Sequence, residues 1–178
     1  MDFFEATEKR FSYKGKFLPD AVPMEHLELI AKAGLLAPSA MNTQCVRLII
    51  LPSNEAITPI SSITMSQGLI TAPAAIVVLT DGYTQKGRID FSFEDYAAAT
   101  QSMLVAATAL GYVSLWLDSP FFDGNNQKAS LAALGIPETH HIRVVLPIGK
   151  PADEIKRREK MPFEKRVSYG KFGQGRVT

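Results

Sequence analysis

The chain has 178 residues, 46% of them hydrophobic and 21% charged, and its formal net charge is +1. This ordinary composition excludes disordered, collagen-like and coiled-coil classes, and the length favours one domain over residues 1–178. The nearly balanced charge argues against nucleic acid or an anionic membrane as a bulk electrostatic partner.

Cys45 is the only cysteine, which excludes an intrachain disulfide and a cysteine zinc cluster and is typical of a reducing compartment. The first residues lack the basic and apolar regions of a secretory signal. No apolar run approaches the roughly 20 residues that span a bilayer. We therefore predict a cytoplasmic protein with no membrane partner and no bound metal.

Two helices are predicted to open the chain. Residues 2–10 form a short first helix of mixed polarity. Pro23 occupies the first turn of the second, where its missing N–H is not needed. Apolar residues then recur at helical spacing until Ala37-Pro38 stops the helix.

Two buried strands follow, with a helix between them. The first strand covers Val46–Leu51, and Ser53 caps a helix across Ala56–Ser66. The second strand covers Ala72–Thr80, with Pro73 at its start, where a hydrogen-bond donor can be spared.

The second half begins with a helix over Phe93–Leu110 that is apolar on every face, which indicates a core or interface position. Gly111 ends it. A short strand, a helix and a long strand follow, over Val113–Leu117, Asn126–Leu134 and Arg143–Ile148. Because helices and strands mix without strict alternation, we predict an α+β fold with a central mixed sheet flanked by helices.

Familiar catalytic signatures are absent from the sequence, including the P-loop, His-Glu-x-x-His and Gly-x-Ser-x-Gly. The three histidines are interpreted as ordinary surface or capping residues. In an extended segment after the first helix, Arg10, Ser12 and Lys14 would share one face. Two cations and a hydroxyl suit a phosphate, although a solvated basic segment is the simpler interpretation.

Two further polar segments are candidates. Ala37–Gln44 is a turn between a buried helix and a buried strand, and a plain connecting loop would explain its proline and serine. The amides of Asn42 and Gln44 could read a heterocycle edge or a sugar hydroxyl. The second segment, Arg157–Pro162, is basic, and a solvated face is its simplest interpretation.

Together these motifs resemble the nitroreductase family of FMN enzymes, in the right order over nearly the whole chain. The matching segments are Arg10-x-Ser12-x-Lys14, Ala37–Gln44, Ala72-Pro73, Leu110-Gly111, Ser114-x-Trp116, Leu134–Glu138, Gly149–Pro151 and Arg158-x-Lys160 before Pro162. The chain departs from the family at Cys45-Val46, where Pro-Trp is usual, and at Ser102, where Asn is common. The first departure affects the shape of the acceptor pocket.

The resemblance implies a nitroreductase-like fold, an intertwined homodimer and an FMN site at the subunit interface. Its implied cofactor-binding residues are Arg10, Phe11, Ser12, Lys14, Pro38, Ser39, Ala40, Asn42, Gln67, Ser119, Arg158 and Lys160. Arg10, Ser12, Arg158 and Lys160 would hold the phosphate, and Lys14 would lie near the flavin O2 edge. The residues from Pro38 to Asn42 would line the isoalloxazine from the partner subunit. Gln67 would contact the pyrimidine edge, and a backbone N–H between residues 119 and 124 would contact N5.

The implied activity is transfer of hydride from NADH or NADPH, through flavin N5, to a small electrophilic acceptor such as a nitroaromatic or quinone. The kinetics would be ping-pong, and no side-chain acid or base is required because the cofactor carries the chemistry. Alternatives are a flavin-storage protein without efficient turnover, and a family branch with dehydrogenase, enone-reductase or dehalogenase chemistry. An interaction module without a cofactor is a third.

Overall fold

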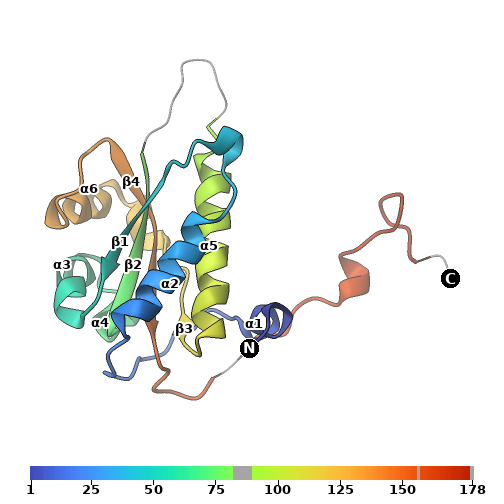
Figure 1. The fold of residues 1–178 in the computed structure, drawn as a ribbon, viewed down its shortest axis with the longest axis horizontal. Helices are drawn as coiled ribbons and strands as arrows, with labels where there is room; N and C mark the ends of the chain where they lie inside the picture. The colour runs from blue at the N-terminus through green and yellow to red at the C-terminus, as the bar shows by residue number, and fades with distance from the viewer. Residues whose placement is uncertain (82–89, 156, 177–178) are drawn as a thin grey trace.

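The structure, a computed structural model, describes residues 1–81, 90–155 and 157–176 (Figure 1). Its described strands form one sheet in the order β1-β2-β4-β3. They are β1 (Val46–Leu51), β2 (Ala74–Asp81), β3 (Val113–Ser114) and β4 (His140–Gly149). The sheet therefore places the long strand β2 between two neighbours and leaves β1 and β3 at its edges.

The pairing differs from the predicted mixed sheet, because all neighbouring strands are antiparallel. Parallel pairing occurs among the described residues only as an isolated bridge between Ser12 and Ser114. The reason lies in the connection from β1 to β2. It leaves β1 at Leu51 and enters β2 at Ala74, next to Ala75, which is the register partner of Leu51. The chain thus returns to the same end of the sheet, which reverses the strand direction.

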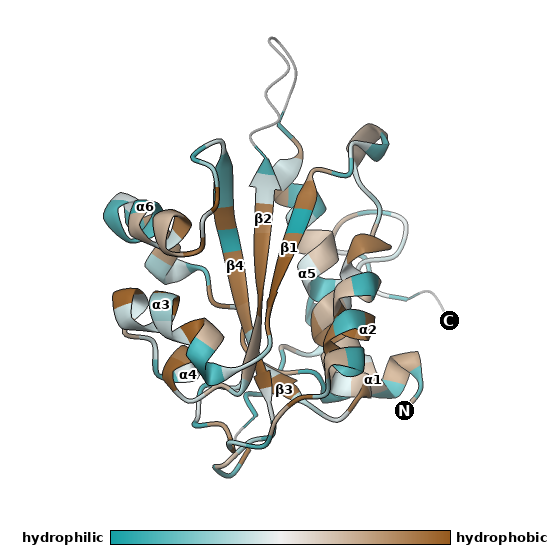
Figure 2. Cartoon of the chain, turned by 60° about the vertical axis from the view of Figure 1, so that its left-hand side comes forward, coloured by the Kyte–Doolittle hydropathy of each residue, from teal (hydrophilic) through white to brown (hydrophobic). Residues whose placement is uncertain are grey.

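Helices cover both faces of this sheet (Figure 2). Along β2, alternate side chains face opposite layers, as the pleat requires. Ile76 and Val78 pack with α2 (Met24–Leu35) and α5 (Ser92–Ala109). Ala75 and Val77 pack with the opposite layer, which is formed by α3 (Asn54–Thr64), α4 (Gln67–Ile70) and α6 (Gly124–Ala133). Both faces of β2 are therefore buried, which explains its continuous apolar sequence.

Most predicted elements are confirmed. The first helix is α1 (Phe3–Lys9), and β1 has the predicted bounds. The Ser53 hydroxyl caps α3 by accepting a hydrogen bond from the Ala56 N–H at 3.2 Å. Gly111 has a φ of 79°, a conformation that suits glycine just beyond a helix. The third predicted strand is shorter than expected, because after Ser114 the chain makes only an isolated bridge, between Leu117 and Val145.

The predicted apolar helix, α5, is a core helix with a polar start. Met103, Leu104 and Ala107 pack in the core against the sheet, and Asp95 in the first turn is also buried. Phe93 on another face is 54% exposed. Within the described residues, no helix combines the length and apolar character needed to cross a membrane.

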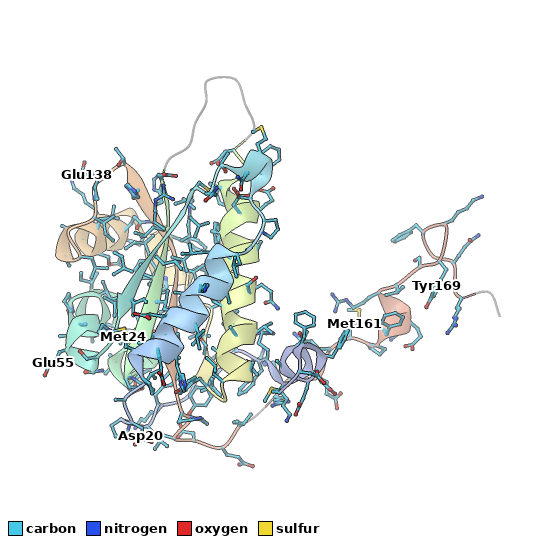
Figure 3. All side chains as sticks on the ribbon, in the orientation of Figure 1. Asp20, Met24, Glu55, Glu138, Met161 and Tyr169 are labelled. Carbon is cyan, nitrogen blue, oxygen red and sulfur yellow. The ribbon has the colours of Figure 1, made fainter. Side chains whose placement is uncertain are left out.

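Beyond β4, the chain leaves the body of the molecule. Figures 1 and 3 show residues 157–176, with Met161 and Tyr169 labelled, as a segment that extends past α1. Its only helical turn is a short 3-10 helix, η3 (Phe163–Lys165). Met161 and Phe163 are each 61% exposed, and Phe172 is fully exposed. This C-terminal segment has apolar side chains that its own chain does not cover.

Candidate functional site

One cavity lies between the segment that follows α1 and the segment that follows β4. Its volume is about 620 Å³, and residues after α1 and after β4 line it. The N-terminal wall is fixed to the sheet, because the Tyr13 N–H donates to the Ser114 carbonyl at 2.9 Å. The lining residues are Glu8, Arg10, Phe11, Ser12, Tyr13, Lys14, Gly15, Glu154, Arg157, Arg158 and Lys160. We call this the basic cavity.

A buried tyrosine holds the two walls of the basic cavity together. The Tyr13 hydroxyl donates to the Lys16 carbonyl and accepts a hydrogen bond from the Asp153 N–H at 3.1 Å. The Asp153 carboxylate in turn accepts from the Lys16 N–H at 2.8 Å. Gly15 lies inside this arrangement, and a Cβ there would meet the Asp153 carboxylate and the Tyr13 hydroxyl at 2.7 Å. The close approach therefore requires glycine.

The electrostatics of the basic cavity favour an anion. Five of its lining residues are Lys or Arg and two are Glu. In the described chain, no ion pair joins these cations to Glu8 or Glu154. The Arg157 guanidinium lies 5.2 Å from the centre of the Phe11 ring, which orients the C-terminal wall. Free guanidinium and ammonium groups beside the Ser12 hydroxyl match the charge and the acceptor oxygens of a phosphate.

The structure thus brings together six of the sequence-predicted site residues, although the two segments are far apart in the chain. They are Arg10, Phe11, Ser12, Lys14, Arg158 and Lys160. The remaining predicted residues lie elsewhere.

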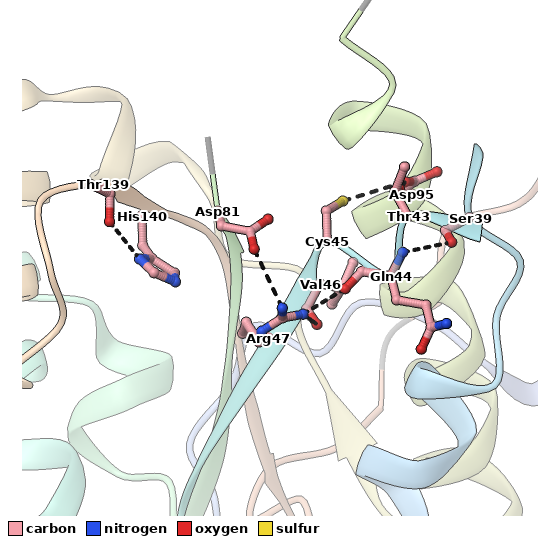
Figure 4. Close-up of polar contacts among 10 residues, drawn as sticks. All are labelled: Ser39, Thr43, Gln44, Cys45, Val46, Arg47, Asp81, Asp95, Thr139 and His140. Atoms are coloured by element: carbon pink, nitrogen blue, oxygen red, sulfur yellow. Dashed lines mark hydrogen bonds and ion pairs between the residues drawn. The ribbon is translucent and has the colours of Figure 1, made fainter. Parts of the chain in front are cut away.

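A second cavity, of about 420 Å³, lies beside the loop that joins α2 to β1, and Pro38 and Ser39 line it. We call residues 37–45 the 37–45 loop. Its backbone is strained, because Met41, Asn42 and Gln44 have φ values of 52°, 55° and 51°. The Ser39 hydroxyl accepts a hydrogen bond from the Gln44 N–H at 3.0 Å, which closes the loop on itself (Figure 4).

Asp95 lies beneath this loop and accepts three hydrogen bonds from it. The donors are the Ala40 N–H at 2.9 Å, the Thr43 hydroxyl at 3.3 Å and the Cys45 thiol at 3.3 Å. Burial, together with the neighbouring Asp95 carboxylate, raises the pKa of Cys45 to about 11. The thiol is therefore protonated near neutral pH and is not poised as a nucleophile.

The two cavities lie at opposite ends of α5. The 37–45 loop bonds to Asp95 in the first turn of α5, whereas the basic cavity adjoins Ser114, just beyond the end of the helix. The 18 residues of α5 span about 27 Å at 1.5 Å per residue. A single chain therefore does not bring these two regions onto one small ligand.

Gln67 and Ser119 stand apart from both cavities. Gln67 is the first residue of α4, on the opposite face of the sheet from α5, and its carbonyl accepts from the Thr71 hydroxyl at 3.1 Å. Ser119 begins a 3-10 helix, η2 (Ser119–Phe122), and is exposed. Within one chain, the structure does not place either residue with the other predicted site residues.

Three residues that shape these regions were not predicted from the sequence: Tyr13, Asp95 and Asp153. The partners of Asp95 lie 50 to 55 positions away in the sequence. An acidic residue near a helix start has a local explanation in the helix dipole, which conceals such a role. One signal was available, because an acid inside an otherwise apolar helix requires a partner.

A sheet covered by helices on both faces, with a basic cavity between the segments that follow α1 and β4, defines an α+β protein whose cavity chemistry suits an anion. The sequence profile of the nitroreductase family matches residues 7–68 and 64–150. The chain belongs to the nitroreductase family.

Individual relatives agree with this assignment. A protein from Archaeoglobus fulgidus, provisionally named an NADH dehydrogenase/NAD(P)H nitroreductase, is 39% identical over 131 residues, which are 73% of this chain and 75% of that protein. The structure of an FMN-dependent nitroreductase from Clostridium difficile is 27% identical, with a TM-score of 0.79 over 95% of this chain and 99% of that one. A Bacteroides fragilis nitroreductase with bound FMN is 21% identical, with a TM-score of 0.77 over 96% and 100%, and shares the fold.

Proposed function

We propose that the protein is an FMN-dependent oxidoreductase that uses NAD(P)H to reduce a small electrophilic acceptor, such as a nitroaromatic or a quinone, by a ping-pong mechanism. The observation that carries the proposal is the basic cavity, to which the segments after α1 and after β4 both contribute cations. Family membership and the FMN-dependent relative from Clostridium difficile support the choice of cofactor.

The donor set of the basic cavity fits the phosphate of FMN. Arg10, Arg158 and Lys160 provide charge, and Ser12 provides a hydroxyl. Lys14 lies on the same wall and would face the part of the cofactor that gains negative charge on reduction. When bound, FMN supplies the two-electron chemistry, and the protein supplies position and electrostatics. A cysteine thiolate is not needed, in agreement with the raised pKa of Cys45.

We also propose that residues 1–178 form one domain that works as a homodimer. The 37–45 loop would then approach the flavin bound in the basic cavity of the partner, which removes the separation of about 27 Å set by α5. Exposed apolar side chains support an association surface. On α1, Phe3 is 67% and Phe4 is 81% exposed, and Leu36 after α2 is 76% exposed. The C-terminal segment, which extends away from its own body, would be covered by the second chain.

The first test is the cofactor itself. Purified protein is expected to be yellow, and heat is expected to release FMN, identified against FMN and FAD standards. Anaerobic addition of NADH or NADPH should then bleach the flavin rapidly, and the acceptor should restore the colour. FAD, or no flavin after reconstitution, would overturn the proposal. FMN that is retained but not bleached would indicate flavin storage.

The second test addresses the shared site. Arg10→Ala removes a phosphate contact, and Asn42→Asp changes the 37–45 loop, so each homodimer is expected to be weakly active. If each site takes one residue from each chain, subunit exchange creates one site with both intact contributions, and activity partly returns. Proven exchange without recovery, or an active monomer in sedimentation, would rule out the shared site.

A further inference from the structure

The carboxylate of Asp95 joins three donors that are spread over six residues of the 37–45 loop. It accepts from the backbone of Ala40, the hydroxyl of Thr43 and the thiol of Cys45, at 2.9 to 3.3 Å. Asp95 is only 5% exposed and comes from a different element, α5. Figure 4 shows it next to Thr43 and Cys45, at the start of β1. The loop is therefore bonded at its beginning, middle and end to one side chain.

The geometry of the loop needs such support. Met41, Asn42 and Gln44 are in the left-handed region, which costs roughly 1–2 kcal/mol for each residue other than glycine. A segment with this backbone persists only where its surroundings determine it. The Ser39 hydroxyl bonds to the Gln44 N–H. The Arg47 guanidinium donates to the Gln44 carbonyl, and three further hydrogen bonds, at Ala40, Thr43 and Cys45, lead to Asp95.

The position of Asp95 relates it to the functional part of the loop. Asp95 lines the cavity of about 420 Å³ together with Pro38 and Ser39. It also lines a small neighbouring pocket with Ala40 and Thr43. Pro38, Ser39 and Ala40 are residues that the proposed function places against the flavin. Asp95 is bonded directly to Ala40, so it can set the position of the residues that the proposed function places against the flavin.

A carboxylate suits this role better than an amide or a hydroxyl. An ionised carboxylate is an acceptor only, and its two oxygens together receive several donors. An asparagine would present an NH₂ group in place of one oxygen, so either the Ala40 N–H would face another donor or the Thr43 hydroxyl and the Cys45 thiol would lose their acceptor. The neighbouring Glu94 is exposed and also lies in the first turn of α5. It therefore shares any effect of the helix dipole without touching the loop.

We propose that Asp95 is a positioning residue, which holds the 37–45 loop in the left-handed geometry that presents Pro38, Ser39 and Ala40 to the flavin. This inference rests on the proposed function. It adds a structural role to that function: the buried carboxylate of Asp95 on α5 sets the shape of the 37–45 loop, which would face the flavin.

The test compares the wild-type holoprotein with Asp95→Asn and with the matched control Glu94→Gln. In Asp95→Asn, amide hydrogen exchange at residues 40–45 should rise about tenfold, which corresponds to the loss of one hydrogen bond to a charged group. The visible absorption bands of bound FMN should shift. The rate of flavin reduction by NADH should fall about tenfold, because a tenfold change in rate corresponds to the same free-energy difference as a tenfold change in exchange. Glu94→Gln should match the wild type in all three measurements.

Thr43→Val is the second variant, since it deletes a single donor from a half-buried position. It should change exchange, spectrum and rate in the same directions by a smaller factor, and it decides the matter if Asp95→Asn does not fold. A lower melting temperature with wild-type exchange, spectrum and rate would overturn the inference. A wild type without FMN would overturn the proposed function, whereas the exchange comparison, which needs no flavin, would still test the hold of Asp95 on the loop.

Discussion

The basic cavity and the 37–45 loop differ in what fixes their structure. The loop is fixed within one chain by three hydrogen bonds to the buried carboxylate of Asp95. The cations of the basic cavity belong to two separate segments of the chain, which the hydrogen bond between Tyr13 and Asp153 holds together. The loop is therefore shaped before any ligand arrives. The cavity carries an excess of positive charge, which an anionic ligand would neutralise. Substitutions in the two regions should therefore have different consequences.

The largest effect is expected from removing a cation of the basic cavity. Arg10→Ala or Arg158→Ala should weaken FMN binding by one to two decades in dissociation constant, because a hydrogen bond to a charged group contributes roughly 1.5–3 kcal/mol. Fluorescence titration of the apoprotein with FMN measures this. Lys165→Ala and Lys171→Ala, outside the cavity, should change little. Equal losses at all four positions would indicate a diffuse positive field.

The next effect tests the close approach at Gly15. Gly15→Ala places a Cβ 2.7 Å from the Asp153 carboxylate and the Tyr13 hydroxyl, so the two walls must separate. Overpacking of this kind costs about 1–3 kcal/mol, which should appear as a lower melting temperature and a weaker FMN complex. Gly124→Ala is the matched control, since a Cβ at Gly124 meets nothing within 4 Å. A melting temperature and an FMN affinity of Gly15→Ala equal to those of this control would mean that the walls accommodate the methyl group.

Added salt should have a smaller effect, and it should weaken FMN binding in the basic cavity without changing the 37–45 loop. Exposed charges are screened as the Debye length falls from about 10 Å at 0.1 M to about 3 Å at 1 M salt. FMN affinity should therefore decline several-fold over this range, whereas hydrogen exchange in the 37–45 loop should stay constant. Isothermal titration at a series of salt concentrations gives the first quantity. An affinity that does not respond to salt would contradict an electrostatic basic cavity.

The smallest effect is expected at Cys45. Cys45→Ser should retain FMN and most NAD(P)H oxidation, because the hydroxyl can still donate to Asp95. The pKa of the thiol is raised, so its contribution to stability is present below about pH 9 and is lost as pH rises through about 11. Melting temperatures measured from pH 8 to pH 11 should therefore decline more for the wild type than for Cys45→Ser. Loss of turnover with flavin still bound would instead indicate a thiol step.

The sequence was informative wherever local chemistry decides the structure. Alternation and apolar runs predicted β1 and β2 closely, and Ser53 indicated the cap of α3. The proposed phosphate-binding role of Arg10, Ser12 and Lys14 was predicted because an extended backbone would place the three side chains on one face. The two strands and the helix cap depend on residues a few positions apart, and the structure agrees with these predictions.

Features that depend on contacts between residues far apart in the sequence could not be predicted from it. The antiparallel order of the sheet follows from where connections return, and the role of Asp95 follows from a loop packed over it. The left-handed backbone of Met41, Asn42 and Gln44 lacks the glycine that usually indicates such a turn. Tertiary contacts override local preference in this loop, as is expected where function requires an unusual shape.

The edge position of β1 has a consequence for the isolated chain. β3, at the other edge, is only two residues long, but β1 offers six residues whose outer backbone pairs with no other described strand. A long free edge is a template for intermolecular strand pairing and hence for aggregation. Arg47, which is exposed on β1 and paired with Asp81 at 3.4 Å, puts charge on this edge and opposes such stacking. Replacing it with an aliphatic residue would therefore reduce the yield of native protein from refolding even where the folded enzyme is unchanged.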